Sequence, residues 1–215
     1  MSAPSMSAPT HNRVILASTS PSRLSILRSA GIEPLVEPSD VDEDAAAAQL
    51  TDPSPEEFVM HLAESKARAA WRRREEEGRN SPSDVLIGGD SMLLLDGKLQ
   101  GKPYTVEETI ARWQQQRGKV AHLVTGHSVI YQGESRVEAA VTAVHFGFVS
   151  DADIRAYAQT NEPLLCAGAF TLEAIGGWFI DKIEGDPSSV IGLSLPVVRR
   201  SMEHFGLRVS DYWNL

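Results

Sequence analysis

The 215-residue chain is predicted to fold as a single domain with a mixed α/β architecture. Short apolar runs of strand length occur between longer stretches whose apolar residues repeat at helical spacing. The two kinds of segment interleave without strict alternation, which favours a mixed sheet over a barrel or a doubly wound parallel sheet. Hydrophobic residues make up 42% of the sequence, enough to bury a substantial core.

The first predicted strand is the apolar run Val14 to Ala17, and a hydroxyl-rich loop and a helix follow it. Ser20 suits the N-cap of this helix, and Pro21 suits its first position. Free N–H groups at the helix N-terminus, the hydroxyls of Ser18 and Ser20, and Arg23 in the first turn together suit a phosphate. The same pattern also fits an ordinary capped helix with a surface arginine.

An acidic run from Asp40 to Asp44 follows the first helix and contains Glu43. Carboxylates at this point are suited to holding a divalent cation beside a phosphate. Such a run is also typical of a solvated loop. The residues alone leave both interpretations open.

A long helix is predicted from Pro53 to Gly78, because apolar residues repeat along one of its faces. This apolar stripe consists of Val59, Leu62, Ala63, Ala67, Ala70 and Trp71. Lys66 projects from the same face, so it either extends to the edge of the core or points into a cleft. The basic run Arg72 to Arg74, followed by three glutamates, predicts an exposed helix end.

Asp90 is an acidic residue between two apolar runs, Val85 to Gly89 and Met92 to Leu95, which are predicted to be strands. Gly88 and Gly89 before it allow backbone or ligand to come close. Burying a carboxylate is unfavourable unless a cation, a metal or hydrogen bonds compensate its charge. The sequence therefore predicts that Asp90 is functional.

Lys102 is a further lysine that could meet an anionic ligand. Lys102 lies between Gly101 and Pro103, two residues that shape the backbone, and just before a helix capped by Thr105. The triplet lacks the spacing of a P-loop. The remaining patterns predict a helix carrying Val106, Ile110 and Trp113, a hairpin of strands Val120 to Tyr131 and Arg136 to Val149, a helix from Ser150 through Tyr157, a strand from Trp178 to Ile183, a helix from Pro196 to Phe205, and core positions for Val137, Val141 and Val144.

Charge and composition argue against several classes of function. A net charge of −9 disfavours general nucleic-acid binding, which usually requires a basic stripe. No apolar run approaches the roughly 18 to 20 residues of a membrane-spanning helix. The single cysteine, Cys166, excludes an internal disulfide, fits a cytoplasmic location and is interpreted as a small core residue. Residues 1–12 are predicted to be a disordered lead before one domain of residues 13–215.

Seven sequence blocks occur in order between Arg13 and Gly206: LASTSPSR, SDVDE, ESKA, GGDSM, GKP, RGKVAHLVTG, and AGAF followed by EGDPSSVIGLSLP. Together they closely resemble the Maf family of nucleoside triphosphate pyrophosphatases, also called septum formation proteins. The resemblance implies the Maf/inosine-triphosphatase-like fold, an elongated mixed sheet with flanking helices and two lobes around a central cleft. It also implies a divalent metal cation, Mg²⁺ or Mn²⁺, and often a homodimer.

The resemblance also implies roles for individual residues. Asp90 matches the aspartate assigned as general base, and a metal would bind near Asp90 and Glu43. The matching substrate-binding positions are Ser18, Ser20, Arg23, Lys66 and Lys102. A carboxylate bound to Mg²⁺ is a poorer base, so the choice between base and metal ligand for Asp90 stays open.

Three positions depart from the family pattern. Ser22 stands where the family usually has the first of two arginines, so only Arg23 can serve as the phosphate-binding arginine. Glu173 stands where many members carry a glutamine associated with pyrimidine triphosphates, whereas a subgroup acting on 7-methyl-GTP carries glutamate. An ionised carboxylate accepts hydrogen bonds, which favours a guanine-type base with its N1–H and N2–H. The block Arg117 to His122 keeps only the glycine and, one residue further along, the histidine of the family's SGRTH.

The residues and the resemblance together predict hydrolysis of a nucleoside triphosphate, standard or modified, to the monophosphate and pyrophosphate. One alternative is a nucleotide-binding regulator of cell division that need not turn its ligand over. Another is a phosphatase that releases orthophosphate. Asp90 and Glu43, a candidate base and a candidate metal ligand, favour the pyrophosphatase over the regulator.

Overall fold

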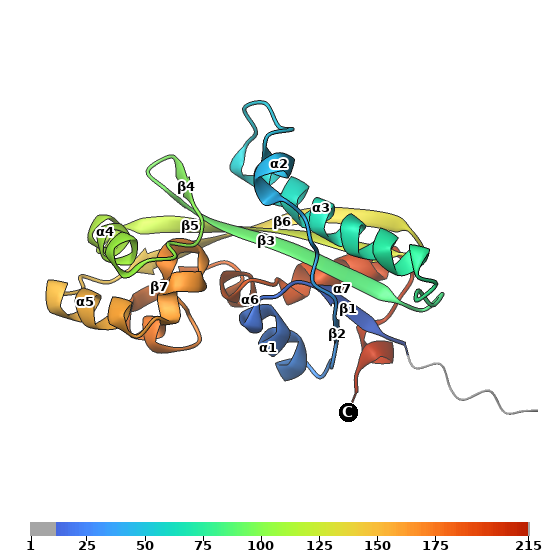
Figure 1. Cartoon of the computed structure of the whole chain (residues 1–215). Helices are drawn as coiled ribbons and strands as arrows, with labels where there is room; N and C mark the ends of the chain where they lie inside the picture. Colours follow the sequence, from blue (N-terminus) through green and yellow to red (C-terminus); the bar gives the residue numbers. More distant parts are fainter. Residues whose placement is uncertain (1–11, 215) are drawn as a thin grey trace, which may run out of the picture.

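A computed structural model describes residues 12–214 and has a mixed α/β fold built on one seven-stranded sheet (Figure 1). The strands are β1 (Val14–Ala17), β2 (Leu35–Val36), β3 (Val85–Leu95), β4 (Lys98–Gln100), β5 (Val120–Tyr131), β6 (Glu134–Phe146) and β7 (Ile180–Glu184). Their order across the sheet is β2-β1-β3-β5-β6-β7, and β4 pairs with β3. β1 is parallel to β2 and β3, and the other pairs are antiparallel. The predicted mixed sheet is confirmed, and the predicted disordered lead lies outside the described residues except for Asn12.

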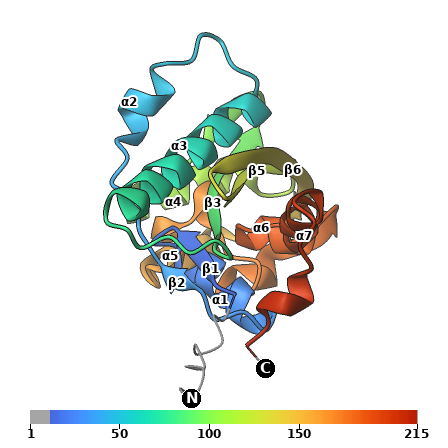
Figure 2. The same ribbon diagram turned by 90° about the vertical axis from the view of Figure 1, so that its right-hand side faces the viewer.

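Helices cover both faces of the sheet. They are α1 (Pro21–Ser29), α2 (Glu43–Ala47), α3 (Pro55–Glu76), α4 (Val106–Gln116), α5 (Asp151–Gln159), α6 (Pro187–Ile191) and α7 (Leu195–His204). Figure 2 shows α3 along one face of the sheet, with α6 and α7 on the opposite face. Three short 3₁₀ helices follow α5, at Glu162–Leu165, Ala167–Ala169 and Ile175–Phe179.

Strand β3 contributes to three hydrophobic clusters, and two of them, near its opposite ends, form the cores of the two lobes. Val85 and Ile87, near its beginning, pack in a core with residues of α1 and α7. Leu93, near its end, packs in a second core around Trp113 of α4. Asp90 is the sixth of the eleven residues of β3, so it lies where one lobe passes into the other.

The expectation of two strands flanking Asp90 is wrong, because β3 is continuous through the glycine pair. Gly88 is needed for packing and not for a break. A Cβ atom at Gly88 would lie 2.7 Å from the Ala63 carbonyl oxygen of α3 and 2.8 Å from the Ala67 Cβ. The backbone of α3 therefore packs directly against the sheet at this point, which brings Lys66 of α3 close to Asp90.

Two further sequence expectations need correction. Val141 is 44% exposed, whereas Val144 is fully buried, because residues three apart on a strand face opposite sides of the sheet. The last strand begins at Ile180 and not at Trp178, which belongs to the preceding 3₁₀ helix and is exposed. The other predicted elements are present; β1 and β5 have the predicted bounds, and the remaining ends differ by up to three residues.

The basic run predicts an exposed end for α3, but the observed end is not uniformly exposed. Arg74 is 3% exposed, and its guanidinium contacts the buried carboxylate of Asp84 and that of Glu37, at 3.3 Å each. Glu37, directly after β2, also binds Arg73 and Arg79, at 2.6 Å each. Arg79 and the other arginines lower the pKa of Glu37 to about 2. Arg74 lies four residues after Ala70, so it continues the apolar face of α3.

We expect Glu37→Gln to lower the free energy of unfolding at pH 7 by about 2 kcal/mol, as for loss of hydrogen bonds to a charged acceptor. Because folding depresses the pKa of Glu37 from 4.5 to about 2, its contribution is present above pH 4.5 and is lost as the pH falls through 2. Urea unfolding of wild type and variant between pH 7 and pH 2.5 checks this. A difference that does not shrink in acid would contradict it.

Candidate active site

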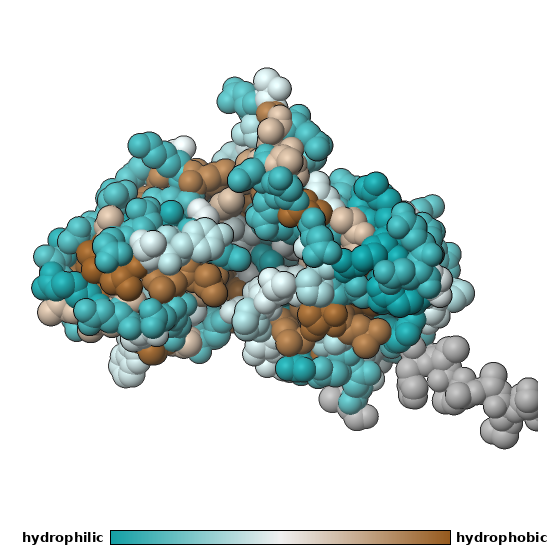
Figure 3. Space-filling view, in the orientation of Figure 1, coloured by the Kyte–Doolittle hydropathy of each residue, from teal (hydrophilic) through white to brown (hydrophobic). Residues whose placement is uncertain are grey.

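All eight predicted site residues line one cleft of ≈ 740 Å³ between the two lobes: Ser18, Ser20, Arg23, Glu43, Lys66, Asp90, Lys102 and Glu173. The space-filling view shows the surface hollowed at this place (Figure 3). One wall comes from the β1–α1 loop, α2 and α3, and the other comes from the loop after β4 and the segment after α5. The sequence thus identified residues that the fold brings together from distant segments.

An ion triad occupies the floor of the cleft. Lys66 Nζ lies 2.7 Å from Asp90 Oδ1 and 2.8 Å from Glu43 Oε1. The alternative in which Lys66 points into a cleft is therefore the one observed. Glu43 is the first residue of α2, which Asp42 caps through a hydrogen bond from Ala45 N, so the acidic run passes from an irregular segment at Asp40 into a capped helix start.

Asp90 is only 6% exposed, and its two carboxylate oxygens differ. Oδ1 accepts a hydrogen bond from Lys66, whereas Oδ2 is buried and finds no hydrogen-bond partner within residues 12–214. Buried polar atoms in proteins are nearly always satisfied, so such an atom in a ligand cleft marks a place where a cation or a water proton would be bound.

Arg23 lies beside this triad and is held by three hydrogen bonds. Its Nε donates to the Gly192 carbonyl oxygen at 2.8 Å, Nη1 to Ser18 Oγ at 3.2 Å, and Nη2 to Ser91 Oγ at 3.1 Å. Burial lowers the pKa of Arg23 from its ordinary value, and the negative charges of Asp90 and Glu43 act against this. The predicted cap is also present, because Ser20 Oγ accepts from Arg23 N at 3.4 Å.

Ser91 and Thr125 support Arg23, and neither was identified from the sequence. Thr125 Oγ1 donates to the Ser189 carbonyl oxygen at 3.1 Å and lies 3.1 Å from Ser91 Oγ. Since the Thr125 proton is used in this way, Ser91 donates to Thr125 and accepts from Arg23. Ser91 and Thr125 are paired between β3 and β5, so only the strand register would have revealed this relay.

His127 holds the loop that receives Arg23, from a fully buried position on β5. Its Nε2 accepts a hydrogen bond from Ser194 N at 2.7 Å, so the proton is on Nδ1, which faces the Glu138 carbonyl oxygen at 3.3 Å. Burial lowers the pKa of His127 to about 4. The ring is therefore neutral at pH 7 and serves as a structural acceptor.

The opposite wall carries Lys102 and Glu173, both exposed. Neither makes an ion pair within the part of the chain that the structure describes, so both are available to a ligand. Cys166 also lines the cleft and is half-buried, so its interpretation as a core residue is wrong. Burial raises the pKa of the Cys166 thiol to about 11, with Glu173 and Glu162 adding to the effect, so the thiol is not a nucleophile at pH 7.

The donor set fits a hard divalent cation that is also held by a substrate. Among residues 12–214 there is no group of three or more His, Cys, Asp or Glu side chains arranged for a metal. Asp90 and Glu43 supply two carboxylates, and Asp90 Oδ2 is unused. One or two carboxylates completed by substrate phosphates and water is a usual environment for Mg²⁺.

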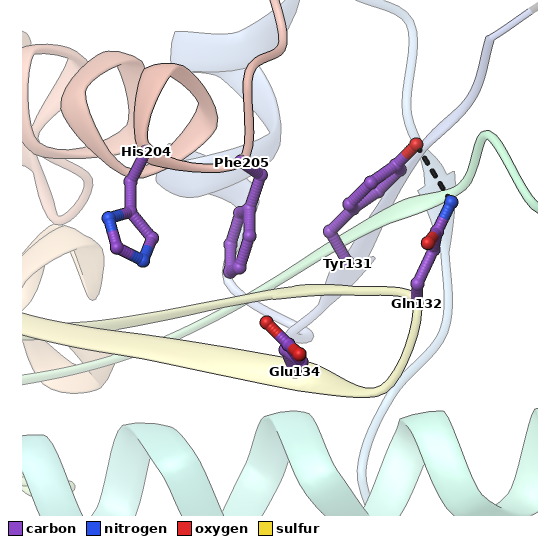
Figure 4. A pocket seen from close by; sticks show the side chains of 5 residues that line it. All are labelled: Tyr131, Gln132, Glu134, His204 and Phe205. Carbon is purple, nitrogen blue, oxygen red and sulfur yellow. Dashed lines mark hydrogen bonds between the residues drawn. The ribbon is translucent and has the colours of Figure 1, made fainter.

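A smaller hollow of ≈ 310 Å³ lies at the turn between β5 and β6 (Figure 4). It is lined by Tyr131, Gln132, Glu134, His204 and Phe205. Its lining includes one carboxylate and no lysine or arginine, so it lacks the charges that a triphosphate requires. The cleft at Asp90 is therefore the candidate active site.

Comparison with known proteins agrees with this site. Residues 13–205 match the family model described as Maf-like protein. A protein of Corynebacterium diphtheriae named nucleoside triphosphate pyrophosphatase is 63% identical over 201 residues, covering 94% of this chain and 98% of that protein. Proteins of the same name from Corynebacterium efficiens and Rhodococcus jostii are 61% and 50% identical, covering 94% and 93% of this chain and 98% and 95% of theirs.

No helix within residues 12–214 has the length and apolar character needed to cross a membrane.

The fold of the described residues agrees with the family as well. The mixed sheet, here of seven strands, the two lobes and the cleft between them agree with what the resemblance implied. The family match and the relatives confirm that resemblance over nearly the whole chain, and the chain belongs to the Maf family.

Proposed function

We propose that this protein is a nucleoside triphosphate pyrophosphatase, which hydrolyses the α–β phosphoanhydride and releases a nucleoside monophosphate and pyrophosphate. The observation that carries the proposal is the ionic floor of the cleft. A buried carboxylate with one unsatisfied oxygen, Asp90 Oδ2, lies beside the cations Lys66 and Arg23. The names of the close relatives give the same activity.

Three cationic side chains in the cleft are placed to bind the triphosphate. A guanidinium has five N–H donors, and Arg23 uses three of them on the protein, which leaves two for phosphate oxygens. Lys66 and Lys102 add positive charge from opposite walls of the cleft. Charge that develops on the phosphate oxygens and on the leaving pyrophosphate is stabilised by such fixed cations.

Asp90 is suited to orient the attacking water at the α-phosphorus and to accept its proton. The carboxylate is fixed through Oδ1 by Lys66, and Oδ2 is left to accept from water. Asp90 and Glu43 are also the residues that would hold Mg²⁺ or Mn²⁺. When bound, such a cation supplies charge stabilisation to the phosphate oxygens.

Product analysis tests the proposal. The purified chain is incubated with Mg²⁺ and a panel of canonical and modified nucleoside triphosphates in ¹⁸O-labelled water. Equal amounts of monophosphate and pyrophosphate, with the label in the monophosphate, are expected. Orthophosphate with a nucleoside diphosphate would instead indicate a phosphatase, and tight binding without turnover would indicate a nucleotide-binding regulator.

We expect Glu173→Gln to change the base preference of the enzyme. An ionised glutamate accepts from both N1–H and N2–H of a guanine-type base, whereas a glutamine amide also presents donors. The ratio of kcat/KM for GTP to that for UTP should fall by about tenfold, in the range of losses caused by mismatched polar groups. Glu33→Gln, which alters an exposed pair with Arg28, is the control. An unchanged ratio would show that Glu173 does not recognise the base.

A further inference from the structure

The loop that carries Glu173 has little regular backbone pairing of its own. Residues 170–174 belong to no helix or strand, and the 3₁₀ helix Ile175–Phe179 follows directly. Thr171 and Gly176 are buried on either side of the exposed residues Glu173 to Ile175. A loop of this kind keeps one conformation only if its ends are fixed by groups outside it.

Glu162 supplies that fixation. Its Oε1 accepts hydrogen bonds from Gly176 N at 3.1 Å, from the Tyr157 hydroxyl at 3.1 Å and from the Thr171 hydroxyl. Its Oε2 accepts from Ile175 N at 3.2 Å. Thus one carboxylate holds both ends of the loop that presents Glu173.

The environment of Glu162 requires an ionised acceptor. Burial acts to raise the pKa of Glu162, but hydrogen bonds from Thr171, Gly176, Ile175 and Tyr157 outweigh it and lower the pKa. An ionised carboxylate offers about four acceptor positions and no donor. Oε1 of Glu162 already receives three donors and Oε2 one, so most of this acceptor capacity is used by Tyr157 and the loop.

Packing around Glu162 leaves the loop little freedom. A Cβ atom at Gly176 would lie 2.5 Å from both the Thr171 carbonyl oxygen and the Tyr157 hydroxyl oxygen. Thr171 N also donates to the Tyr157 hydroxyl at 3.2 Å. The loop is therefore closed around Tyr157, a fully buried side chain of the core.

We propose that Glu162 is a positioning residue that sets the nucleobase selectivity of the cleft, by fixing the Thr171–Gly176 loop that presents Glu173 to the base. The inference rests on the proposed pyrophosphatase function. Glu162 acts only at the base end of the cleft, and bond cleavage depends on Asp90, Lys66 and Arg23 at the other end.

The test compares two nucleotides, the best and the poorest substrates of the wild type among triphosphates that differ only in base. In Glu162→Gln, the amide N–H groups face N–H and O–H donors of the loop, so the loop loses its fixed position. The ratio of kcat/KM for the preferred nucleotide to kcat/KM for the poorer one should fall by about tenfold, because the KM of the preferred nucleotide rises. The kcat of the poorer nucleotide should stay within about threefold, because the phosphate end is unchanged.

Further variants separate positioning from loss of structure. Thr171→Val removes the hydroxyl and should lower the ratio in the same way, whereas Thr171→Ser keeps it and should restore the ratio. In a Glu173→Gln background, Glu162→Gln should cause no further loss of selectivity, because the two act through one contact. Thermal unfolding of each variant identifies any that fail to fold, and Glu33→Gln is the surface control.

The outcomes distinguish the inference from the function on which it rests. A wild type that releases no pyrophosphate from any triphosphate would overturn both. Equal losses for both nucleotides, an unchanged ratio in folded Glu162→Gln and Thr171→Val, additive losses in the double variant, or a wild type without base preference would overturn the role of Glu162 while pyrophosphatase activity stands.

Discussion

Replacing Asp90 by asparagine is expected to lower kcat by about 10²–10⁴-fold, the range for loss of a positioned general base. Asparagine has the same shape, but its amide cannot accept a proton from water and has no negative charge to bind a metal. Nucleotide affinity should change far less, because Arg23, Lys66 and Lys102 remain in the cleft. Single-turnover release of pyrophosphate and equilibrium nucleotide binding measure the two quantities separately.

Glu33→Gln is the matched control for Asp90→Asn, since both replace a carboxylate with its amide and Glu33 lies in an exposed pair. Turnover by Asp90→Asn at the wild-type rate would show that Asp90 is not catalytic. Mn²⁺ binding to Asp90→Asn and Glu43→Gln in the absence of nucleotide addresses the second role. Weaker Mn²⁺ binding in both variants would favour metal ligation by Asp90.

Arg23→Ala is expected to lower kcat/KM by about 10²–10³-fold, as for the loss of a fixed donor to transition-state charge. The residues on either side of Arg23 are Ser22 and Leu24, so no neighbouring guanidinium can replace it. Arg23→Lys should also be impaired, because one ammonium cannot contact Gly192, Ser18 and Ser91 together and still meet the phosphates.

The matched control is Arg28→Ala on the same helix, because Arg28 makes only an exposed pair with Glu33. Steady-state kinetics and thermal unfolding of both variants separate an effect on the reaction from one on the fold. Normal hydrolysis by a folded Arg23→Ala variant would show that the β1–α1 loop does not bind the triphosphate.

The sequence contained the local signals of the site but not its long-range supports. Ser20 and Pro21 at the start of α1, and Lys66 on the apolar face of α3, are fixed by spacing of a few residues, so they could be predicted. The contact between Ser91 and Thr125 depends on the pairing of β3 with β5, and no short motif specifies that register. Glu162 supports the loop around Glu173 only after the chain folds back.

Two sequence predictions fail where local composition and side-chain periodicity point to different environments. The run of three arginines suggested a solvated helix end, yet Arg74 lies at helical spacing from Ala70 and is buried. Likewise Val141 is apolar, but it has the opposite strand parity to Val144 and is exposed. In both cases side-chain direction decided burial.

The unbroken course of β3 has a consequence for how the cleft works. Its pairing with β5 continues from Val85 and Tyr131 to Leu94 and His122, passing beneath the cleft without interruption. Hinge closure requires residues that absorb large backbone rotations, and a strand paired along this length offers none. The strand that the two lobes share therefore joins them without a hinge of its own at the cleft.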